Sequence, residues 1–156
     1  MNVPEVSPEG AKRRMERRDA YVYLDVRTEP EFIGGHPPGA LNIPVAFLSP
    51  ETGQMEANEG FLRVVQACIP SETRVIVGCK CGPRSEIATQ MLLAAGYRHT
   101  ANMTGGFSGV LDENGQVLEE GWSTMGYPIE RGSGGDHSFD SLRAKTAAQE
   151  EPPAVE

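Results

Sequence analysis

The stretch that organises this chain is Val75-Ile76-Val77-Gly78-Cys79-Lys80-Cys81-Gly82-Pro83-Arg84-Ser85. It opens with a continuous run of β-branched residues, which is typical of a strand buried on both faces. It ends at an expected helix start, with Ser85 as the N-cap and Glu86 placing a negative charge in the first turn. Between them lies a short loop with a cysteine at its first position and an arginine at its sixth. The sequence therefore predicts a strand, a thiol-bearing loop and a helix N-terminus in direct succession.

This loop has the features of a site for a reactive sulfur. Backbone N–H groups in such loops converge on one point, and the dipole of the following helix makes that point positive. Lys80 and Arg84 add two cations. A cysteine in such a setting is commonly a thiolate near neutral pH, and the thiolate is the nucleophilic form. We therefore expect Cys79 to act as a nucleophile.

The loop resembles the active-site loop of the rhodanese family, which reads Cys, two residues, Gly, one residue, Arg, Ser after a buried strand. Cys79, Gly82, Arg84 and Ser85 occupy every fixed position. The resemblance implies that Cys79 is the catalytic residue that carries sulfur. It also implies that the remaining loop residues bind the substrate, namely Lys80, Cys81, Gly82, Pro83, Arg84 and Ser85. Cys81 is either a resolving thiol for Cys79 or an ordinary loop residue.

A second stretch supports the resemblance. Residues 21–24 read as a strand that ends in Asp25-Val26-Arg27, and an acidic turn and Gly35-His36-Pro37-Pro38-Gly39-Ala40-Leu41-Asn42-Ile43-Pro44 follow. This resembles the second rhodanese signature. Asp25, Arg27 and Glu31 are candidates for catalytic acids or ligands, but we favour a structural ion pair that braces the strand ends. His36 is a candidate base, and in the family this position supports the turn.

A third stretch begins after the strand expected over residues 100–103. It contains Thr104-Gly105-Gly106-Phe107, then Trp122, then Gly126-Tyr127-Pro128-Ile129-Glu130, and it resembles the Gly-Gly-aromatic turn and the closing segment of rhodaneses. Residues 112–120 form an insertion relative to the shortest family pattern. Asn114-Gly115 within it predicts a hairpin. Trp122 either stacks on a ligand or packs in the core, and we favour the core.

The order of elements predicts an α/β fold with an open, mainly parallel sheet and helices on both faces, as in rhodaneses. Helices are expected from Ser7 and Pro8 onward, over residues 61–69 and over residues 85–95, where Ile87 and Met91 share a side with Ala88 and Leu92. Residues 44–60 read as loop. In such sheets ligands bind beyond the carboxyl ends of the strands, which is where Asp25 and Cys79 lie.

Composition divides the 156 residues into one domain and a tail. We place a rhodanese-like domain at residues 1–131 and a flexible, disordered tail at residues 132–156. Gly132-Ser133-Gly134-Gly135 reads as a flexible joint, and the polar residues after it offer little to bury. The tail also accounts for a hydrophobic content of only 38%.

Charge and cysteine content exclude several classes of function. A net charge of −8 argues against nucleic-acid binding. No window is apolar enough to span a membrane, and no apolar signal region precedes the domain, so a cytoplasmic location is expected. The three cysteines do not suggest a disulfide framework, and Cys68 is expected to pack as a small hydrophobe. Cys79 and Cys81 lack the second pair that structural zinc needs, so neither a metal nor a cofactor is expected.

Three classes of function compete. The resemblance implies a sulfurtransferase of the thiosulfate sulfurtransferase type. Its partners are a small-molecule sulfur donor such as thiosulfate and an acceptor, which is cyanide in the test tube and a thiol or protein in a cell. A phosphatase or arsenate reductase on the same fold has a loop one residue longer than that from Cys79 to Arg84. A non-catalytic rhodanese-like interaction module typically lacks the cysteine, and this chain keeps it.

Overall fold

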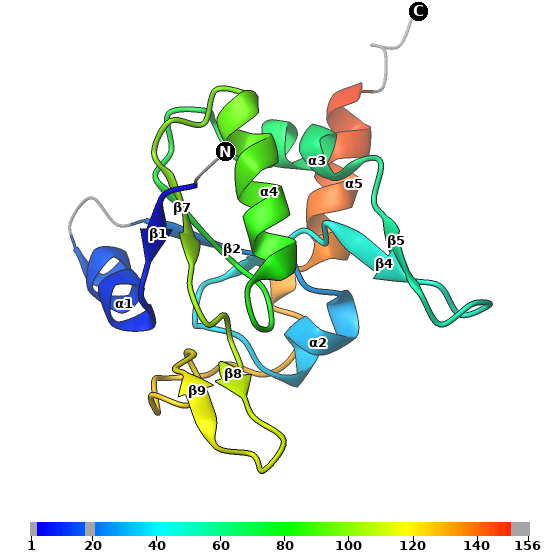
Figure 1. Cartoon of the computed structure of the whole chain (residues 1–156). Coiled ribbons are helices and arrows are strands. Elements are labelled where there is room, and N and C mark those ends of the chain that lie inside the picture. Colours follow the sequence, from blue (N-terminus) through cyan, green and yellow to red (C-terminus); the bar gives the residue numbers. More distant parts are fainter. Residues whose placement is uncertain (1–2, 18–20, 151–156) are drawn as a thin grey trace, which may run out of the picture.

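A five-stranded parallel sheet forms the centre of the molecule (Figure 1). The computed structural model describes residues 3–17 and 21–150. The strand order is β1-β7-β6-β2-β3, and every neighbouring pair is parallel. The strands are β1 (Glu5–Val6), β2 (Val22–Asp25), β3 (Leu41–Asn42), β6 (Val75–Gly78) and β7 (Thr100–Met103). The predicted α/β fold with an open, mainly parallel sheet is therefore confirmed.

Helices cover both faces of this sheet. One face packs against α3 (Phe61–Cys68), α4 (Pro83–Ala94) and α5 (Phe139–Glu150), whose apolar side chains share one buried cluster with Leu24, Val75 and Val77. The other face packs against α1 (Pro8–Glu16) and Trp122, in a cluster with Tyr23 and Ile76. Successive strand residues thus point to opposite clusters, as the pleat of a strand requires.

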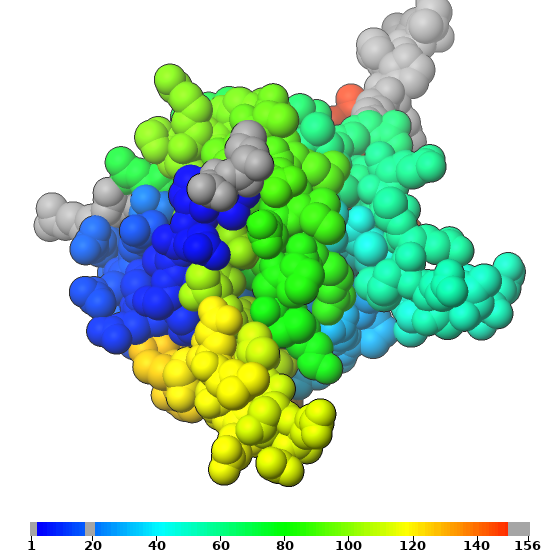
Figure 2. Space-filling model, viewed as in Figure 1, coloured from blue at the N-terminus to red at the C-terminus, as the bar shows by residue number. Residues whose placement is uncertain are grey.

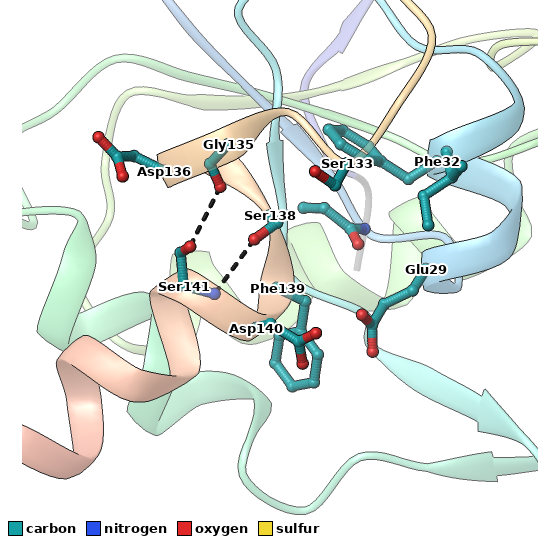
Figure 3. A pocket seen from close by; sticks show the side chains of 11 residues that line it. Glu29, Phe32, Ser133, Gly135, Asp136, Ser138, Phe139, Asp140 and Ser141 are labelled. Carbon is teal, nitrogen blue, oxygen red and sulfur yellow. Dashed lines mark hydrogen bonds between the residues drawn. The ribbon is translucent and has the colours of Figure 1, made fainter.

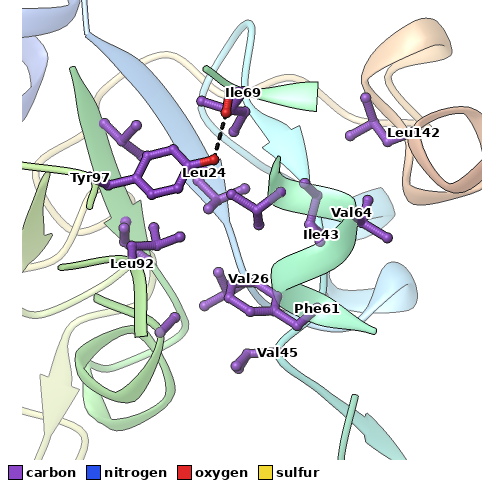
Figure 4. Packing of buried hydrophobic residues seen from close by; sticks show 14 of the residues in the cluster. Leu24, Val26, Ile43, Val45, Phe61, Val64, Ile69, Leu92, Tyr97 and Leu142 are labelled. Carbon is purple, nitrogen blue, oxygen red and sulfur yellow. Dashed lines mark hydrogen bonds between the residues drawn. The ribbon is translucent and has the colours of Figure 1, made fainter. Parts of the chain in front are cut away.

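The larger cluster shows how the sheet and its helices are held together (Figure 4). Leu24, Val26 and Phe61 have no measurable solvent exposure, and the Tyr97 hydroxyl donates a hydrogen bond of 2.6 Å to the carbonyl of Ile69. Each large apolar side chain that is fully buried contributes roughly 1.5–3 kcal/mol. The packing fixes β2 and β6 side by side, so their carboxyl ends meet at one edge of the sheet. α2 (Glu29–Gly34) follows β2 at that edge.

Two antiparallel hairpins project from the domain. The β8–β9 hairpin, of β8 (Val110–Leu111) and β9 (Val117–Glu119), confirms the turn predicted at Asn114-Gly115. The β4–β5 hairpin, of β4 (Ala46–Leu48) and β5 (Met55–Ala57), corrects the expectation of loop over residues 44–60. All three residues of β5 are exposed, so this strand carries no alternation of apolar and polar residues for sequence reasoning to detect.

Residues 135–150 are ordered, which corrects the prediction of a disordered tail after residue 131. They form a 3₁₀ turn, η1 (Gly135–His137), and α5. Phe139 and Leu142 are each 3% exposed, and Thr146 is also buried. These positions lie on one stripe of the helix, which packs against α3. Because the segment is mostly polar, its composition does not reveal this buried stripe. Residues 151–156 of the predicted tail lie outside the described residues.

The segment that leads into α5 crosses the domain beside α2 (Figure 3). A hollow of about 400 Å³ lies between them, lined by Glu29 and Phe32 on one side and by Ser138 and Phe139 on the other. The Ser138 hydroxyl oxygen accepts the N–H of Ser141 at 3.1 Å. The expected flexible joint over residues 132–135 is therefore replaced by a defined path that ends in a capped helix.

None of the helices in residues 3–17 and 21–150 combines the length and apolarity needed to cross a membrane.

Candidate active site

Cys79 directly follows the central strand β6, in the cysteine loop formed by residues 79–82. The residue is only 1% exposed. Its sulfur accepts the backbone N–H of Gly82 at 3.1 Å. Gly82 has φ 127° and ψ −38°, a conformation that side-chain-bearing residues rarely adopt, so glycine lets the backbone turn its N–H toward the sulfur. The loop thus encloses the Cys79 sulfur.

The helix that follows starts earlier than predicted. Its N-cap is Gly82 and Pro83 is its first residue, whereas Ser85 was expected to be the cap. Proline is favoured at this position because its fixed φ suits a helix and its missing N–H has no partner to lose there. Ser85 is instead fully buried, with its hydroxyl oxygen 2.9 Å from the Gly82 carbonyl and 2.5 Å from Oδ1 of Asn102. The helix N-terminus therefore lies immediately beside the Cys79 sulfur.

The buried side of α4 also differs from the prediction. Ser85, Ala88, Thr89 and Leu92 face the core, and Ile87 is 56% exposed. The Thr89 hydroxyl donates to the Ser85 carbonyl at 2.7 Å, so both hydroxyl side chains satisfy their hydrogen bonds within the protein. The expected pairing of Ile87 with the core fails because two polar residues occupy the buried stripe.

Arg84 turns away from the cysteine loop toward α2. Its guanidinium makes a two-pronged ion pair with Glu31, with distances of 2.8 Å and 3.0 Å to the two carboxylate oxygens. Burial alone raises the pKa of Glu31, but the hydrogen bonds from Arg84 and Thr28 outweigh it and lower the pKa to about 2. The expectation that Arg84 attracts an anionic donor is thus weakened, because its charge is already compensated by Glu31.

Asp25 and Arg27 form the structural ion pair that the sequence predicts. Arg27 Nη2 lies 2.7 Å from Asp25 Oδ2 and also donates to the Gly35 carbonyl at 2.6 Å. Both side chains are buried, at 1% and 4% exposure. Burial alone lowers the pKa of Arg27, but the hydrogen bond and charge of Asp25 reverse this and raise it. The pair ties the end of β2 to the turn after α2.

His36 is also a structural residue. Its ring stacks on Phe32 at a centroid distance of 3.6 Å, and its Nδ1 lies 2.7 Å from the Phe32 carbonyl. Its backbone pairs with Glu130 in an isolated bridge. The expectation that this position supports the turn is confirmed.

A segment that sequence reasoning left without a role clamps the cysteine loop from behind. The N–H groups of Phe107 and Ser108 donate to the carbonyls of Cys79 and Lys80, each at 2.8 Å. A Cβ on Gly106 would lie 2.6 Å from the Lys80 carbonyl, so only glycine permits this approach. The Gly-Gly-aromatic motif was the available signal, but nothing in the sequence indicates which loop it faces.

Trp122 and Cys68 pack against hydrophobic side chains, as the sequence predicts. Trp122 packs in the core at 2% exposure and donates from Nε1 to the Pro128 carbonyl at 2.7 Å. Cys68 is half-buried against the larger hydrophobic cluster.

The outer side of the cysteine loop carries the exposed side chains of Lys80 and Cys81. Cys81 lines a shallow hollow of about 220 Å³ together with Gly82 and Pro83. In the part of the chain that the structure describes, no three His, Cys, Asp or Glu side chains come together in a group that could hold a metal ion. Of the predicted site residues, Gly82 thus contacts the Cys79 sulfur, and Lys80 and Cys81 are exposed. Arg84 and Ser85 instead bond to Glu31 and Asn102, outside the loop.

Comparison with known proteins places this geometry in a family. The model of the rhodanese-like domain family matches residues 7–113. Thiosulfate sulfurtransferase 16, a chloroplastic protein of Arabidopsis thaliana, is 41% identical over 86 residues, which cover 55% of this chain and 70% of that protein. Thiosulfate sulfurtransferase 18 of the same plant is 36% identical over 105 residues, which cover 66% and 76%. The mitochondrial protein HIGH ARSENIC CONTENT 1 of Arabidopsis thaliana is 43% identical over 90 residues, which cover 58% and 52%.

Solved structures share the fold. Rv0390 from M. tuberculosis superposes with a TM-score of 0.69 at 27% identity, and the match covers 85% of this chain and all of that one. A thiosulfate sulfurtransferase from Pseudomonas aeruginosa superposes with a TM-score of 0.59 at 23% identity, over 94% of this chain and 24% of that one. This chain thus spans between about half and three quarters of the length of the three plant relatives.

Proposed function

Because this chain belongs to the family of rhodanese-like domains, we propose that it is a sulfurtransferase in which Cys79 carries sulfur as a persulfide. The observation that carries the proposal is the position of the Cys79 sulfur. It lies at the carboxyl end of β6, beside the N-terminus of α4, and it accepts the N–H of Gly82 at 3.1 Å. Two relatives named as thiosulfate sulfurtransferases support the choice of reaction.

In the first half-reaction, the Cys79 thiolate attacks the outer sulfur of a donor such as thiosulfate. A new S–S bond forms, the S–S bond of thiosulfate breaks, and sulfite leaves with the bonding electron pair. The outer sulfur of the resulting persulfide carries negative charge. Preorganised N–H groups and the dipole of α4 stabilise that charge where it develops.

In the second half-reaction, a thiophilic acceptor attacks the outer sulfur of the persulfide. The S–S bond to Cys79 breaks, and the cysteine returns to its thiolate form. Cyanide serves as acceptor in an assay and becomes thiocyanate, and a thiol or a protein serves in a cell. The loop residues keep one geometry through both halves because Arg84 and Ser85 fasten it to α2 and β7.

Lys80 is the residue that attracts an anionic donor in this mechanism. Its side chain is exposed, and it forms no ion pair with the residues that the structure describes. Arg84, which is bound to Glu31, instead positions the loop. Cys81 is exposed and lies two residues from Cys79, so it is accessible to donor or acceptor.

A second candidate function is the reduction of arsenate or the hydrolysis of phosphate esters. A relative named for its arsenic content favours including it. Four residues separate Cys79 from Arg84. This spacing is one residue shorter than in phosphatases and arsenate reductases of this fold, which argues against a loop that binds a tetrahedral oxyanion. A non-catalytic interaction module is disfavoured because the chain keeps the cysteine.

Intact-mass measurement after treatment with thiosulfate tests the proposal. Wild-type protein should gain the mass of one sulfur atom and should transfer it to cyanide. Cys79→Ser should lose both properties, while Cys68→Ser, at a half-buried cysteine that packs against the core, should retain them. Normal turnover by Cys79→Ser would refute the mechanism. Turnover of an aryl phosphate or arsenate without a persulfide on Cys79 would replace it with the second candidate.

A further inference from the structure

The charges beside the cysteine loop do not suit a small anionic acceptor. The two buried or half-buried arginines nearest the loop are paired, Arg27 with Asp25 and Arg84 with Glu31. Lys80 remains as an exposed cation. The hollow beside Cys81 is lined by three exposed carboxylates, those of Glu5, Glu86 and Glu119. This surface attracts a positively charged partner and repels an anionic one.

An apolar groove lies beside α2. It occupies about 450 Å³ between the first turn of α2 and the β4–β5 hairpin. Thr28, Glu29, Pro30 and Glu31 line one wall, and Phe47, Leu48 and Met55 line the other. Leu48 and Met55 face each other across the hairpin and are 58% and 45% exposed. Large apolar side chains that gather on an exposed surface mark an interaction site.

One ion pair connects the groove with the helix that follows the cysteine loop. Glu31 lines the groove, and its two carboxylate oxygens hold the guanidinium of Arg84, five residues after Cys79. The hairpin projects from the body of the domain, as Figure 2 shows for residues 46–57. A protein seated in the groove therefore contacts Glu31, whose carboxylate holds Arg84 in the first turn of α4.

We propose that the groove docks the protein that accepts sulfur from Cys79, and that this acceptor is a basic protein with apolar residues beside its reactive cysteine. The proposal rests on the sulfurtransferase function given above. Apolar side chains of the acceptor enter between Pro30 and Met55, and its lysines or arginines face the carboxylates around the loop. A second copy of this chain is a poor occupant, because each copy carries a net charge of −8.

The transfer step balances without an oxidant or reductant. The acceptor thiolate attacks the outer sulfur of the Cys79 persulfide and forms a new S–S bond. The bond between that sulfur and Cys79 breaks, and its electron pair leaves with Cys79 as a thiolate. The persulfide reacts in its protonated form, after its anionic outer sulfur has taken a proton from water, and that proton stays on the sulfur that is transferred. The acceptor thus becomes a persulfide, and Cys79 is ready for the next donor.

Two synthetic peptides serve as probes. One reads Lys-Leu-Cys-Leu-Lys and the other Glu-Leu-Cys-Leu-Glu, so they differ only in the sign of charge. Persulfide is first loaded on Cys79 from thiosulfate and measured by intact mass, and sulfur transfer to each peptide is then followed in a single turnover. Versions of both peptides with Ser in place of Cys are used for binding by fluorescence anisotropy, which needs no persulfide.

The double variant Leu48→Ser/Met55→Ser is compared with Leu118→Ser on the β8–β9 hairpin, where Leu118 is 68% exposed and lies outside the groove. We expect the double variant to weaken binding and transfer to the basic peptide about tenfold, because two apolar contacts are lost. Leu118→Ser should stay within about twofold of wild type by the same scale. Persulfide loading and cyanide discharge should be unchanged in all three proteins.

The outcomes separate the two proposals. A lack of loading in wild type contradicts the sulfurtransferase function, while the anisotropy measurement still tests the groove. Unchanged binding in the double variant, or equal binding of the acidic peptide, overturns the docking proposal. Concentration-dependent dimerisation of wild type that the double variant abolishes would assign the groove to a second copy instead.

Discussion

Two glycines allow the cysteine loop to keep its shape. Gly82 turns its N–H toward the Cys79 sulfur, and Gly106 lets the segment behind the loop approach the carbonyls of Cys79 and Lys80. Gly106 combines a left-handed φ of 62° with a close approach, since an added Cβ would meet Lys80 backbone atoms at 2.6 Å. Position 106 therefore tests whether this clamp holds the nucleophile in place.

Gly106→Ala should destabilise the fold and reduce sulfur transfer together. Its control is Gly126→Ala, where φ is 74° but nothing lies within 4 Å of an added Cβ. Backbone strain alone costs about 1–2 kcal/mol at either position. The clash at Gly106 should add about 2 kcal/mol, because a packed contact must open. Chemical denaturation and single-turnover transfer measure both effects. Equal losses in the two variants would show that the clamp contributes nothing beyond backbone conformation.

The ion pair of Glu31 with Arg84 makes a pH-dependent contribution to stability. The pKa of Glu31 is about 2 in the folded protein, against an ordinary value of 4.5. A depressed carboxylate pKa stabilises the fold above the unfolded-state value, and this stabilisation is lost as the pH falls through the folded-state value. The contribution is therefore complete above about pH 4.5 and disappears toward pH 2.

Glu31→Gln should remove this acid-sensitive contribution. We expect a loss on the order of 1 kcal/mol at pH 7, because a partly exposed ion pair is screened by solvent. The difference in unfolding free energy between wild type and variant, measured by chemical denaturation, should shrink to zero as the pH falls from 4.5 to about 2. Arg84→Ala should remove the same increment, whereas Glu72→Gln, three residues before the amino end of β6, should not. A difference in unfolding free energy that persists at pH 2 would show that the ionised carboxylate of Glu31 is not its source.

At the scale of secondary-structure elements, α5 closes one side of the core. Phe139 and Leu142 enter the cluster that contains α3, and the Phe139 ring lies 5.9 Å from that of Phe47 on the β4–β5 hairpin. The Gln149 side chain also donates to the Ala67 carbonyl at 3.3 Å. The C-terminal segment is therefore part of the folded domain.

Leu142→Ala should cost about 2–4 kcal/mol, because it removes a buried side chain and leaves a cavity. For a domain of this size the melting temperature should fall by roughly 4–15 °C. Lys145→Ala on the same helix is the matched control, since Lys145 is exposed and its loss should change the melting temperature little. Deletion of residues 134–156 should destabilise more than Leu142→Ala. A melting temperature unchanged by that deletion would show that α5 does not dock in solution.

The sequence predicted the elements whose residues carry a strong local pattern. The β-branched run before Cys79 and the strand before Asp25 follow from periodicity, and Asn114-Gly115 follows from turn chemistry. The elements it did not predict depend on contacts between distant segments. The β4–β5 hairpin has no buried face of its own, and the stripe of α5 is three residues within a polar segment.

The same distinction applies to the candidate site. Cys79 and its loop are recognisable from spacing alone. The roles of three other residues depend on partners that are distant in the chain. Arg84 bonds to Glu31, 53 residues away, and Ser85 bonds to Asn102, 17 residues away. Gly106 packs against Lys80, about 26 residues away. A local rule suggested Ser85 as a helix cap, but proline at the first helical position and the buried Asn102 shifted the boundary.

At the scale of the whole molecule, topology gathers the site and net charge sets what approaches it. Parallel strands place the ends of β2 and β6 at one edge of the sheet, where Arg27, Arg84 and Cys79 are all held. The chain as a whole carries a charge of −8, and the two arginines are neutralised locally. Outside the short range of the Lys80 charge, an anionic donor therefore meets a repulsive field on approach, and a basic acceptor meets an attractive one.

This field predicts opposite salt dependences for the two half-reactions. The Debye length is about 30 Å at 0.01 M salt and about 8 Å at 0.15 M, so salt screens the field of the whole molecule. As the salt concentration rises from 0.01 M to 0.15 M, kcat/KM for thiosulfate should rise roughly threefold, and the transfer rate to the basic peptide Lys-Leu-Cys-Leu-Lys should fall by a similar factor.

Charge variants test whether these salt dependences come from the carboxylates beside the loop. Neutralising two of them, in Glu86→Gln/Glu119→Gln, should reduce the slope of both rates against salt concentration. Glu72→Gln, three residues before the amino end of β6 and far from its carboxyl end, should leave both salt dependences nearly unchanged. Slopes of the same sign for donor and acceptor would show that salt acts on the chemistry or the fold, and not through the charge of the molecule.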